Sequence, residues 1–238
     1  SRAARNYWMA FVEGVELPWW TGTQKQGRCV VHLQLSDNQT NLLQTLAKSL
    51  RVQEKSIFLS IHMLLLGVLN GGKNIATSVV FNSRPEMTGS EKTLGLFLNS
   101  LPFSVSDEAS TFGQKIQQVD QKLQEINQYR KYPLANIQRE TGLDFSGALF
   151  NYVNFHVYEE IIDKIQVEQA ALFEDTNYLL VLTCAKSGQK YNLSLILDNN
   201  TFDGEFVTRI EGYLRNIINQ VLLSPDGNIA SACFMQAA

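Results

Sequence analysis

Two apolar segments separated by a long polar stretch constrain the fold of this chain more than any other feature. The first, residues 75–81, is short and rich in β-branched side chains, which is typical of a buried strand. Residues 82–92 are polar and contain a proline and a glycine, so they predict a loop. Residues 93–105 are apolar again, up to a point where Pro102 is expected to interrupt the ladder of a sheet. The sequence therefore predicts two strands that frame a long loop, and loops of this length are often functional.

The rest of the chain predicts an α/β fold, with helices packed on a mixed, largely antiparallel sheet. Residues 56–69 are apolar almost all round, so this helix is expected to be central and buried. Residues 1–229 read as one folded unit without an internal boundary, and residues 230–238 read as a linker or tail. Helices are expected over residues 6–12, 37–50, 56–69, 111–132, 134–140 and 203–221, and further strands over 30–35, 147–155, 165–173, 178–184 and 191–197.

Composition excludes several classes of function. The formal net charge of −3 gives no basic field for nucleic acid, and the most apolar segment, residues 57–69, is too short to span a bilayer. The three cysteines lack metal-like spacing, and an odd number without a disulfide framework is typical of a reduced protein. We therefore expect a cytoplasmic protein with no metal site, no nucleic-acid partner and no membrane partner.

A phosphate-binding loop is the first chemical motif to weigh. Residues 67–73 match Gly-x-x-x-x-Gly-Lys, but Asn74 stands where the magnesium-binding Ser or Thr is required. The segment also closes a helix, whereas a phosphate loop opens one. We therefore interpret Gly71 and Gly72 as the end of a helix.

The histidines and possible nucleophiles do not predict a catalytic residue. His62 lies on the apolar helix and is interpreted as a core histidine with one satisfied nitrogen, while His32 is expected on the surface of the sheet. His156 follows an aromatic strand and is left open as a cleft residue. No pair of histidines has zinc-like spacing, and there is no Gly-x-Ser-x-Gly motif. We assign no catalytic residue in this chain.

Asn99 interrupts an apolar strand, and a buried amide there must find hydrogen-bond partners. Two interpretations stand. Either Asn99 ties the neighbouring loop down internally, or it faces a channel and binds an amide or thioester. For Arg84 the alternatives are an ion pair that anchors the loop and a position in a cleft.

The same stretch resembles the condensation domains of nonribosomal peptide synthetases. In that family an Arg-x-x-Pro-Glu-like loop leads into Gly-x-Phe-x-Asn-Thr-Leu-Pro; here Ser83–Glu86 precedes LGLFLNSLP at residues 94–102. The similarity extends in order from about residue 6 to residue 229. It includes the Tyr-Trp pair at residues 7–8, the long helix at 56–71, YPLANI at 132–137 and FSGALFNYVNF at 145–155.

The resemblance also identifies what this chain lacks. Condensation domains have two similar lobes, and their His-His-x-x-x-Asp-Gly motif lies in the first. Nothing here matches that motif, since Met63 follows His62, so the chain resembles the C-terminal lobe alone, like one lobe of the coenzyme A-dependent acyltransferase superfamily. Three positions depart from the family pattern: residues 129–131 replace His-Gln-Asp, Phe103-Ser104 replaces a segment that often holds arginine, and Ser100 replaces threonine.

The resemblance implies a function in amide-bond formation. A thioester-bound donor and acceptor, each on the phosphopantetheine arm of a carrier protein, would meet in a tunnel between this lobe and an N-terminal lobe. No cofactor would be bound directly by this chain. Alternatives are a non-catalytic platform that binds a carrier protein or a tailoring partner, and an acyltransferase that uses coenzyme A. The residues that the resemblance places at the tunnel are Arg84, Gly95, Phe97, Asn99, Ser100, Asn151 and Tyr152.

Overall fold

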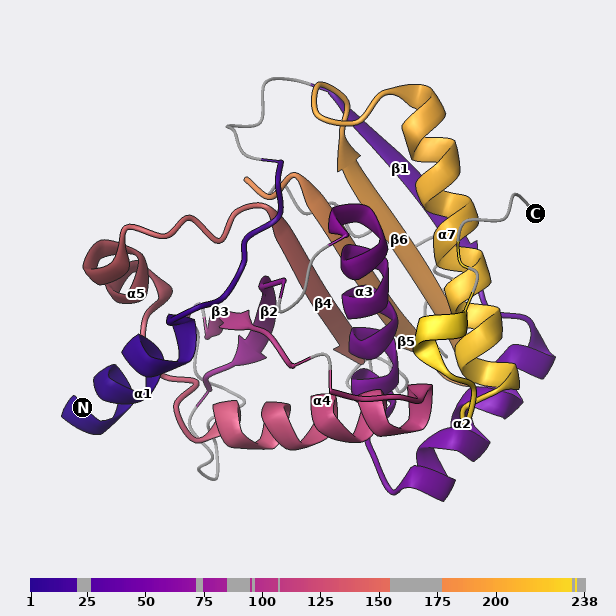
Figure 1. Ribbon diagram of the computed structural model, residues 1–238, viewed down its shortest axis with the longest axis horizontal. Helices are drawn as coiled ribbons and strands as arrows, with labels where there is room; N and C mark the ends of the chain where they lie inside the picture. Colours follow the sequence, from indigo (N-terminus) through magenta and orange to yellow (C-terminus); the bar gives the residue numbers. More distant parts are fainter. Residues whose placement is uncertain are drawn as a thin grey trace.

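The computed structural model describes residues 1–20, 27–71, 75–84, 95, 97–106, 108–154, 177–232 and 234 (Figure 1). Within them, six strands form one sheet in the order β1-β6-β5-β4-β2-β3. β4 pairs in parallel with β5 and β2, and the other three pairings are antiparallel, so the expected mixed sheet is confirmed. The strands are β1 (Arg28–Gln34), β2 (Thr77–Asn82), β3 (Leu98–Phe103), β4 (Ala148–Asn154), β5 (Leu180–Ser187) and β6 (Lys190–Asp198).

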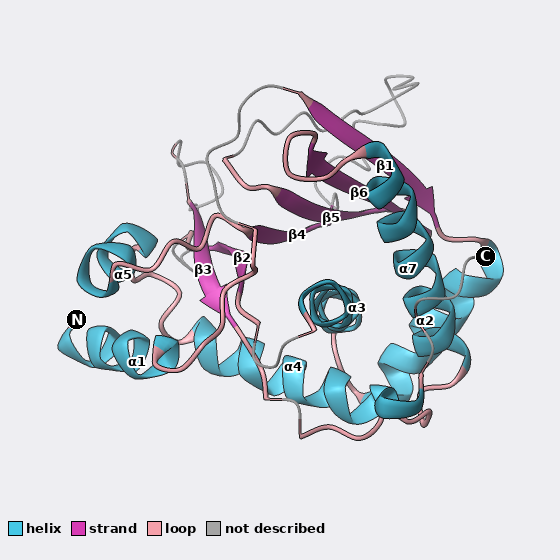
Figure 2. Ribbon diagram, turned by 45° about the horizontal axis from the view of Figure 1, so that its top comes forward, coloured by secondary structure: helices cyan, strands magenta, loops and turns pink. Residues whose placement is uncertain are grey.

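Helices α2, α3, α4 and α7 cover one face of the sheet (Figure 2). α3 lies in the centre of this layer and contacts α2, α4, α7 and β4, and Ser56–Leu66 are all buried, as its apolar sequence predicts. α1 and α5 lie side by side near β3 (Figures 1 and 2). The helices are α1 (Arg2–Val12), α2 (Asp37–Leu50), α3 (Glu54–Asn70), α4 (Phe112–Asn127), α5 (Leu134–Thr141) and α7 (Gly204–Leu223), with a short 3-10 helix, η3 (Ile229–Ser231).

Among the described residues, no single helix is both long and apolar enough to cross a membrane; α2 and α3 reach that composition only as a pair, bent by 105°.

Most of these helices begin at their own capping residues. Ser36 and Thr111 form capping boxes with Gln39 and Gln114 at the starts of α2 and α4. Asp203 caps α7 by accepting a hydrogen bond from the Phe206 amide. Because these capping residues can be recognised in the sequence, the starts of these helices can be predicted from it.

α3 has no side-chain cap of its own, and a carboxylate from α4 takes that place. Asp120 is buried, and its Oδ1 accepts hydrogen bonds from the Gln53 amide at 3.3 Å and the Ser56 hydroxyl at 2.6 Å. Its Oδ2 accepts one from Gln124 Nε2 at 2.6 Å. Asp120 therefore joins two helices that share one face of the sheet.

Replacing Asp120 with alanine is expected to lower the free energy of unfolding by about 1–3 kcal/mol, because a buried hydroxyl and the start of α3 lose their acceptor. Urea denaturation at neutral pH measures the change. The exposed neighbour Gln121→Ala serves as the control and is expected to change stability by less than about 0.5 kcal/mol. Equal effects of the two substitutions would contradict the role of Asp120.

β3 continues through Pro102 to Phe103, so the expectation that this proline interrupts the ladder is wrong. Pro102 pairs with Ser78 of β2. β3 lies at the edge of the sheet and has a single neighbouring strand, and edge strands tolerate a residue without an amide hydrogen.

The packed part of the chain also extends beyond the expected boundary at residue 229. Ile229 donates its amide hydrogen to the Ser110 carbonyl at 2.9 Å. The Phe234 side chain is 9% exposed, and its ring lies 6.1 Å from that of Phe112. An apolar residue five positions past that boundary therefore packs against α4. The strand expected over residues 165–173 and the interpretation of His156 lie outside the described residues.

Candidate functional site

Five of the candidate residues lie on the β2–β3 hairpin and its connection. β2 and β3 pair antiparallel, with Phe81 opposite Asn99 and Val80 opposite Ser100. The side chains of Asn99 and Ser100 are both partly buried. Because neighbouring residues on a strand point to opposite faces, these two candidates do not face the same side of the sheet.

Asn99 is held in a group of hydrogen bonds that we call the hairpin clamp: Asn82, Ser83, Asn99, Arg130 and Tyr132. Asn99 Nδ2 donates to the carbonyl oxygens of Arg130 at 2.9 Å and Tyr132 at 2.8 Å. The Ser83 hydroxyl also donates to the Arg130 carbonyl at 3.1 Å, and Arg130 Nε donates to the Asn82 carbonyl at 3.1 Å. The clamp thus joins both strands of the hairpin to the segment that follows α4.

Arg84, Gly95 and Phe97 lie together at the open end of this hairpin. The Arg84 guanidinium carbon is 4.2 Å from the centre of the Phe97 ring, which is a cation–π arrangement. The Phe97 carbonyl accepts a hydrogen bond of 2.6 Å from the Ser83 amide. A Cβ atom added to Gly95 would lie 3.3 Å from the same ring, so this close approach favours glycine. These three candidates are therefore neighbours in space.

Asn151 and Tyr152 lie on opposite faces of β4. Tyr152 faces α3, because its ring is 6.1 Å from that of Phe58 and its hydroxyl donates to Glu54 Oε2 at 3.1 Å. Asn151 is buried and pairs with Thr183 of β5, on the opposite face. The seven candidates therefore do not form one cluster.

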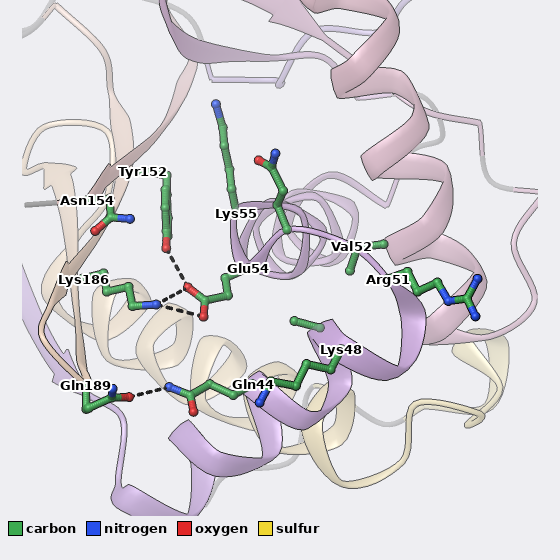
Figure 3. A pocket seen from close by; sticks show the side chains of 12 residues that line it. Gln44, Lys48, Arg51, Val52, Glu54, Lys55, Tyr152, Asn154, Lys186 and Gln189 are labelled. Atoms are coloured by element: carbon green, nitrogen blue, oxygen red, sulfur yellow. Dashed lines mark hydrogen bonds and ion pairs between the residues drawn. The ribbon is translucent and has the colours of Figure 1, made fainter. Parts of the chain in front are cut away.

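Tyr152 lines a cleft of about 690 Å³ between α2, α3 and the ends of β4 and β5 (Figure 3), which we call the α3 cleft. At its centre, the Glu54 carboxylate accepts hydrogen bonds from Lys186 Nζ at 3.0 and 2.9 Å, in addition to the one from Tyr152. The lining residues are Gln44, Ala47, Lys48, Arg51, Val52, Gln53, Glu54, Lys55, Tyr152, Asn154, Lys186 and Gln189.

The ionisation of this central group follows from its neighbours. Burial alone would raise the pKa of Glu54, but the nearby Tyr191 hydroxyl and the Lys186 ammonium group together lower that pKa below its usual range. Burial alone would lower the pKa of Lys186, but the interaction with the Glu54 carboxylate is stronger, so the pKa of Lys186 is raised. Burial and the Glu54 carboxylate raise the pKa of Tyr152. At neutral pH the cleft therefore contains an ion pair with a protonated tyrosine beside it.

Replacing Glu54 with glutamine is expected to lower the free energy of unfolding by about 1–2 kcal/mol, because Lys186 stays partly buried without its counter-charge. A double-mutant cycle with Lys186→Met isolates the pair, and urea denaturation measures each variant. The pKa of Glu54 is lower in the folded chain than in the unfolded chain. The coupling free energy between Glu54 and Lys186 is therefore expected in full at pH values above the usual pKa of a glutamate, and it is lost as the pH falls through the folded pKa. Additive effects of the two substitutions at pH 7 would contradict the coupling.

The described histidines do not line this cleft. His62 is fully buried on α3; its Nε2 lies 2.9 Å from Thr77 Oγ1, and its Nδ1 has no hydrogen-bond partner among the described residues. This confirms the interpretation of a core histidine with one satisfied nitrogen. His32 is exposed on β1, with Nδ1 3.1 Å from Ser194 Oγ, as expected for the surface of the sheet. Neither ring is placed for proton transfer in the α3 cleft.

The sequence did not single out Glu54 or Lys186. They lie 132 residues apart, and Tyr152 lies 98 residues from Glu54, so no short motif links them. A carboxylate in the first turn of a helix and a lysine near a turn are both ordinary on a solvated surface. Their contact depends on the parallel pairing of β4 with β5, which places the ends of both strands beside α3.

The fold is that of solved condensation-domain structures. The condensation domain of the Monacolin K polyketide synthase MokA superimposes with a TM-score of 0.78 at 14% identity, covering 96% of this chain and 58% of that chain. The four-domain nonribosomal peptide synthetase AB3403 gives a TM-score of 0.83 at 14% identity, covering 97% of this chain and 20% of that one. The X-domain in the complex with OxyB from teicoplanin biosynthesis superimposes with a TM-score of 0.80 at 14% identity, covering 99% of this chain and 56% of that chain.

The family model described as "Condensation domain" matches residues 2–238. The chain therefore belongs to the condensation domain family, as its motifs predict. Bacitracin synthase 3 of Bacillus licheniformis is 25% identical over 248 residues, which cover 95% of this chain and 4% of that protein. Tyrocidine synthase 2 of Brevibacillus parabrevis is 28% identical over 240 residues, 92% of this chain and 7% of that protein. The chain thus spans a small part of each of these relatives.

Proposed function

We propose that this chain is the C-terminal lobe of a condensation domain that forms amide bonds in a nonribosomal peptide synthetase. The observation that carries the proposal is the extent of the match. The family model covers residues 2–238, yet the chain spans 58% of the solved MokA condensation domain. The absence of a His-His-x-x-x-Asp-Gly motif from these 238 residues agrees with their being the second lobe.

In this proposal the lobe positions substrates and does not transfer protons. The acceptor amine attacks the thioester carbonyl of the donor, both being carried on phosphopantetheine arms of carrier proteins in the cytoplasm. The base comes from the first lobe, and the wall supplied by this chain raises the rate by holding the two groups close. The clamped hairpin supports such a role, because Asn99 and Arg130 fix the hairpin end that bears Arg84 and Phe97.

The test is a single-turnover assay with a donor-loaded and an acceptor-loaded carrier protein. The chain alone is expected to form no amide above the uncatalysed rate. The same chain preceded by the first lobe of its parent gene, with an intact His-His-x-x-x-Asp-Gly motif, is expected to form the amide. Amide formation by the chain alone would refute the proposal.

A second candidate is a non-catalytic platform that binds a carrier protein or a tailoring partner. It is favoured by the fold similarity to the X-domain of teicoplanin biosynthesis, whose structure is described as a complex with OxyB. The same assay separates the two candidates. A two-lobe protein that has the intact motif and binds a carrier protein but forms no amide would support the platform.

A further inference from the structure

Helix α1 packs against the segment that carries part of the hairpin clamp. We call residues 129–132, which follow α4, the bridge segment. The Tyr7 ring of α1 stacks on the Tyr129 ring, with the ring centres 4.0 Å apart and the planes 17° from parallel. Trp8 Nε1 donates to the Tyr129 carbonyl at 3.3 Å, across 121 positions of sequence. The Tyr-Trp pair of α1 therefore holds the first residue of the bridge segment by both its ring and its backbone.

The remaining residues of the bridge segment hold the hairpin of β2 and β3. The Arg130 carbonyl accepts hydrogen bonds from Asn99 Nδ2 at 2.9 Å and from the Ser83 hydroxyl at 3.1 Å. The Tyr132 carbonyl accepts a second hydrogen bond from Asn99 Nδ2, at 2.8 Å. Within the segment, the Tyr132 amide donates to the Tyr129 carbonyl at 3.0 Å, which closes the four residues into one turn. This turn is therefore bonded to α1 on one side and to the hairpin on the other.

Burial decides which contacts of α1 matter most. Trp8 is fully buried, so water cannot replace the hydrogen bond between its indole N–H and the Tyr129 carbonyl. The stacked rings of Tyr7 and Tyr129 add an attraction beyond the burial of their apolar surface. Arg5 also forms an ion pair with Glu140 of α5, but the Arg5 side chain is 53% exposed, and exposed ion pairs contribute little. Tyr7 and Trp8 thus dominate the contact.

We propose that Tyr7 and Trp8 are positioning residues for the hairpin of β2 and β3, acting through the bridge segment. The two carbonyls that Asn99 binds belong to the same turn as the carbonyl that Trp8 binds. A turn of four residues closed by its own hydrogen bond has little freedom to deform. A shift of α1 therefore moves the acceptors of Asn99 with it, through a continuous network of contacts.

The displacement extends to the end of the hairpin where Arg84 and Phe97 lie. Ser83 makes the connection: its hydroxyl is bonded to the Arg130 carbonyl, and its amide donates to the Phe97 carbonyl at 2.6 Å. The Arg84 guanidinium lies over the ring of the same phenylalanine. Where this hairpin forms a wall for substrates, α1 sets the position of that wall. This consequence rests on the proposed function, whereas the link between α1 and the hairpin does not.

Hydrogen exchange followed by NMR on the full 238-residue chain tests the link. The reporters are the side-chain amide hydrogens of Asn99 and the backbone amide of Ser83. Tyr7→Leu removes the stacked ring, and Trp8→Phe removes the indole donor while a ring stays in the core. Each variant is expected to speed exchange at both reporters about three- to tenfold relative to the amides of β6, which β5 and β4 separate from the hairpin.

Two variants serve as controls. Tyr7→Phe keeps the stacked ring and is expected to leave both reporters unchanged. Phe206→Leu breaks a stack of the same kind on α7, where the Phe202 and Phe206 rings lie 5.8 Å apart, and is also expected to leave them unchanged. Unchanged reporters in Tyr7→Leu would overturn the proposal. Equal acceleration at the hairpin and at β6, or the same effect from Phe206→Leu, would do so too, since either would reduce the effect to global stability.

The reverse substitution keeps the test independent of whether Trp8→Phe folds. Asn99→Ala removes the hydrogen bonds on the hairpin side and leaves α1 intact. It is expected to speed exchange of the Trp8 indole hydrogen, because a coupling between two sites is reciprocal. The amide spectrum of each variant verifies its fold. A Trp8 indole hydrogen that exchanges at the native rate in Asn99→Ala would overturn the proposal.

The single-turnover assay of the two-lobe protein measures the consequence for the reaction. Tyr7→Leu is expected to slow amide formation about three- to tenfold, because the wall is no longer held in place, and Tyr7→Phe is expected to restore the native rate. A native rate in Tyr7→Leu would overturn the positioning role in the reaction. A native two-lobe protein that forms no amide would count against the proposed function, and the exchange rates would still decide whether Tyr7 and Trp8 position the hairpin.

Discussion

Replacing Phe58 with alanine is expected to lower the free energy of unfolding by about 3–5 kcal/mol. Phe58 is fully buried on α3, with its ring 6.1 Å from that of Tyr152 and 5.5 Å from that of Tyr191. Truncation removes buried apolar surface and leaves a cavity in the centre of the layer between sheet and helices. The midpoint of urea denaturation at neutral pH, at an unchanged slope, measures the loss.

The control for this substitution is Leu223→Ala. Leu223 is the last residue of α7 and is 65% exposed, so its truncation is expected to change stability by less than about 0.5 kcal/mol. Phe58→Leu retains part of the volume and is expected to fall between the two. A loss for Phe58→Ala no larger than that for Leu223→Ala would contradict the central position of α3.

Phe58→Ala is also expected to disturb the α3 cleft. Phe58 lies one helical turn after Glu54, and both contact Tyr152. Loss of the Phe58 ring therefore removes the packing that holds the tyrosine against the Glu54–Lys186 pair. This physical link makes α3 both the core of the fold and one wall of the cleft.

Local patterns were sufficient to predict most of the architecture. The apolar run of α3 predicts a helix buried on all sides, and the structure places it in the centre of the helical layer. The alternation in residues 30–35 predicts β1, whose Leu33 is buried while His32 is exposed. Capping residues such as Ser36 fix the start of α2. These signals are short in range, so they can be found in a single sequence.

Features that depend on tertiary pairing were not predictable in this way. Pro102 reads as the end of a strand until the sheet order shows that β3 is an edge. The cap of α3 comes from Asp120, 67 residues after Gln53, and no local pattern indicates it. For Asn99 the sequence shows that an amide needs partners, but the structure is required to identify the carbonyls of Arg130 and Tyr132.

The family motifs identify neighbours in sequence rather than one site in space. The motif residues on the hairpin do lie together, since Arg84 contacts Phe97. The side chains of Asn151 and Tyr152, which are adjacent on β4, point away from each other, because successive residues of a strand face opposite sides of the sheet. Tyr152 faces the α3 cleft, and Asn151 faces away from it. A role for all seven residues in one channel therefore remains a proposal.

Acid is expected to destabilise this fold through His62 before its carboxylates titrate. Burial lowers the pKa of His62 to about 3, against a usual value of 6.5. The unfolded chain therefore binds a proton between these values that the folded chain does not bind, so stability falls as pH drops below 6.5. The expected slope approaches about 1.4 kcal/mol per pH unit, or about 2–3 kcal/mol between pH 6.5 and 4.5.

Urea denaturation across pH 5–6.5 measures this slope for the native chain and for His62→Gln. Glutamine does not titrate, so the pH-dependent part of stability in this window is expected to disappear even where the variant is less stable at neutral pH. Gln34→Ala, which replaces an exposed residue of β1 that does not titrate, is the control and is expected to keep the native slope. A labelled-histidine NMR titration adds a direct reading of the ring. The His62 ring is buried, with Nε2 bonded to Thr77 and Nδ1 without a hydrogen-bond partner among the described residues, so nothing there stabilises an added positive charge. A His62 resonance that titrates near pH 6.5 in the folded chain would therefore contradict the argument.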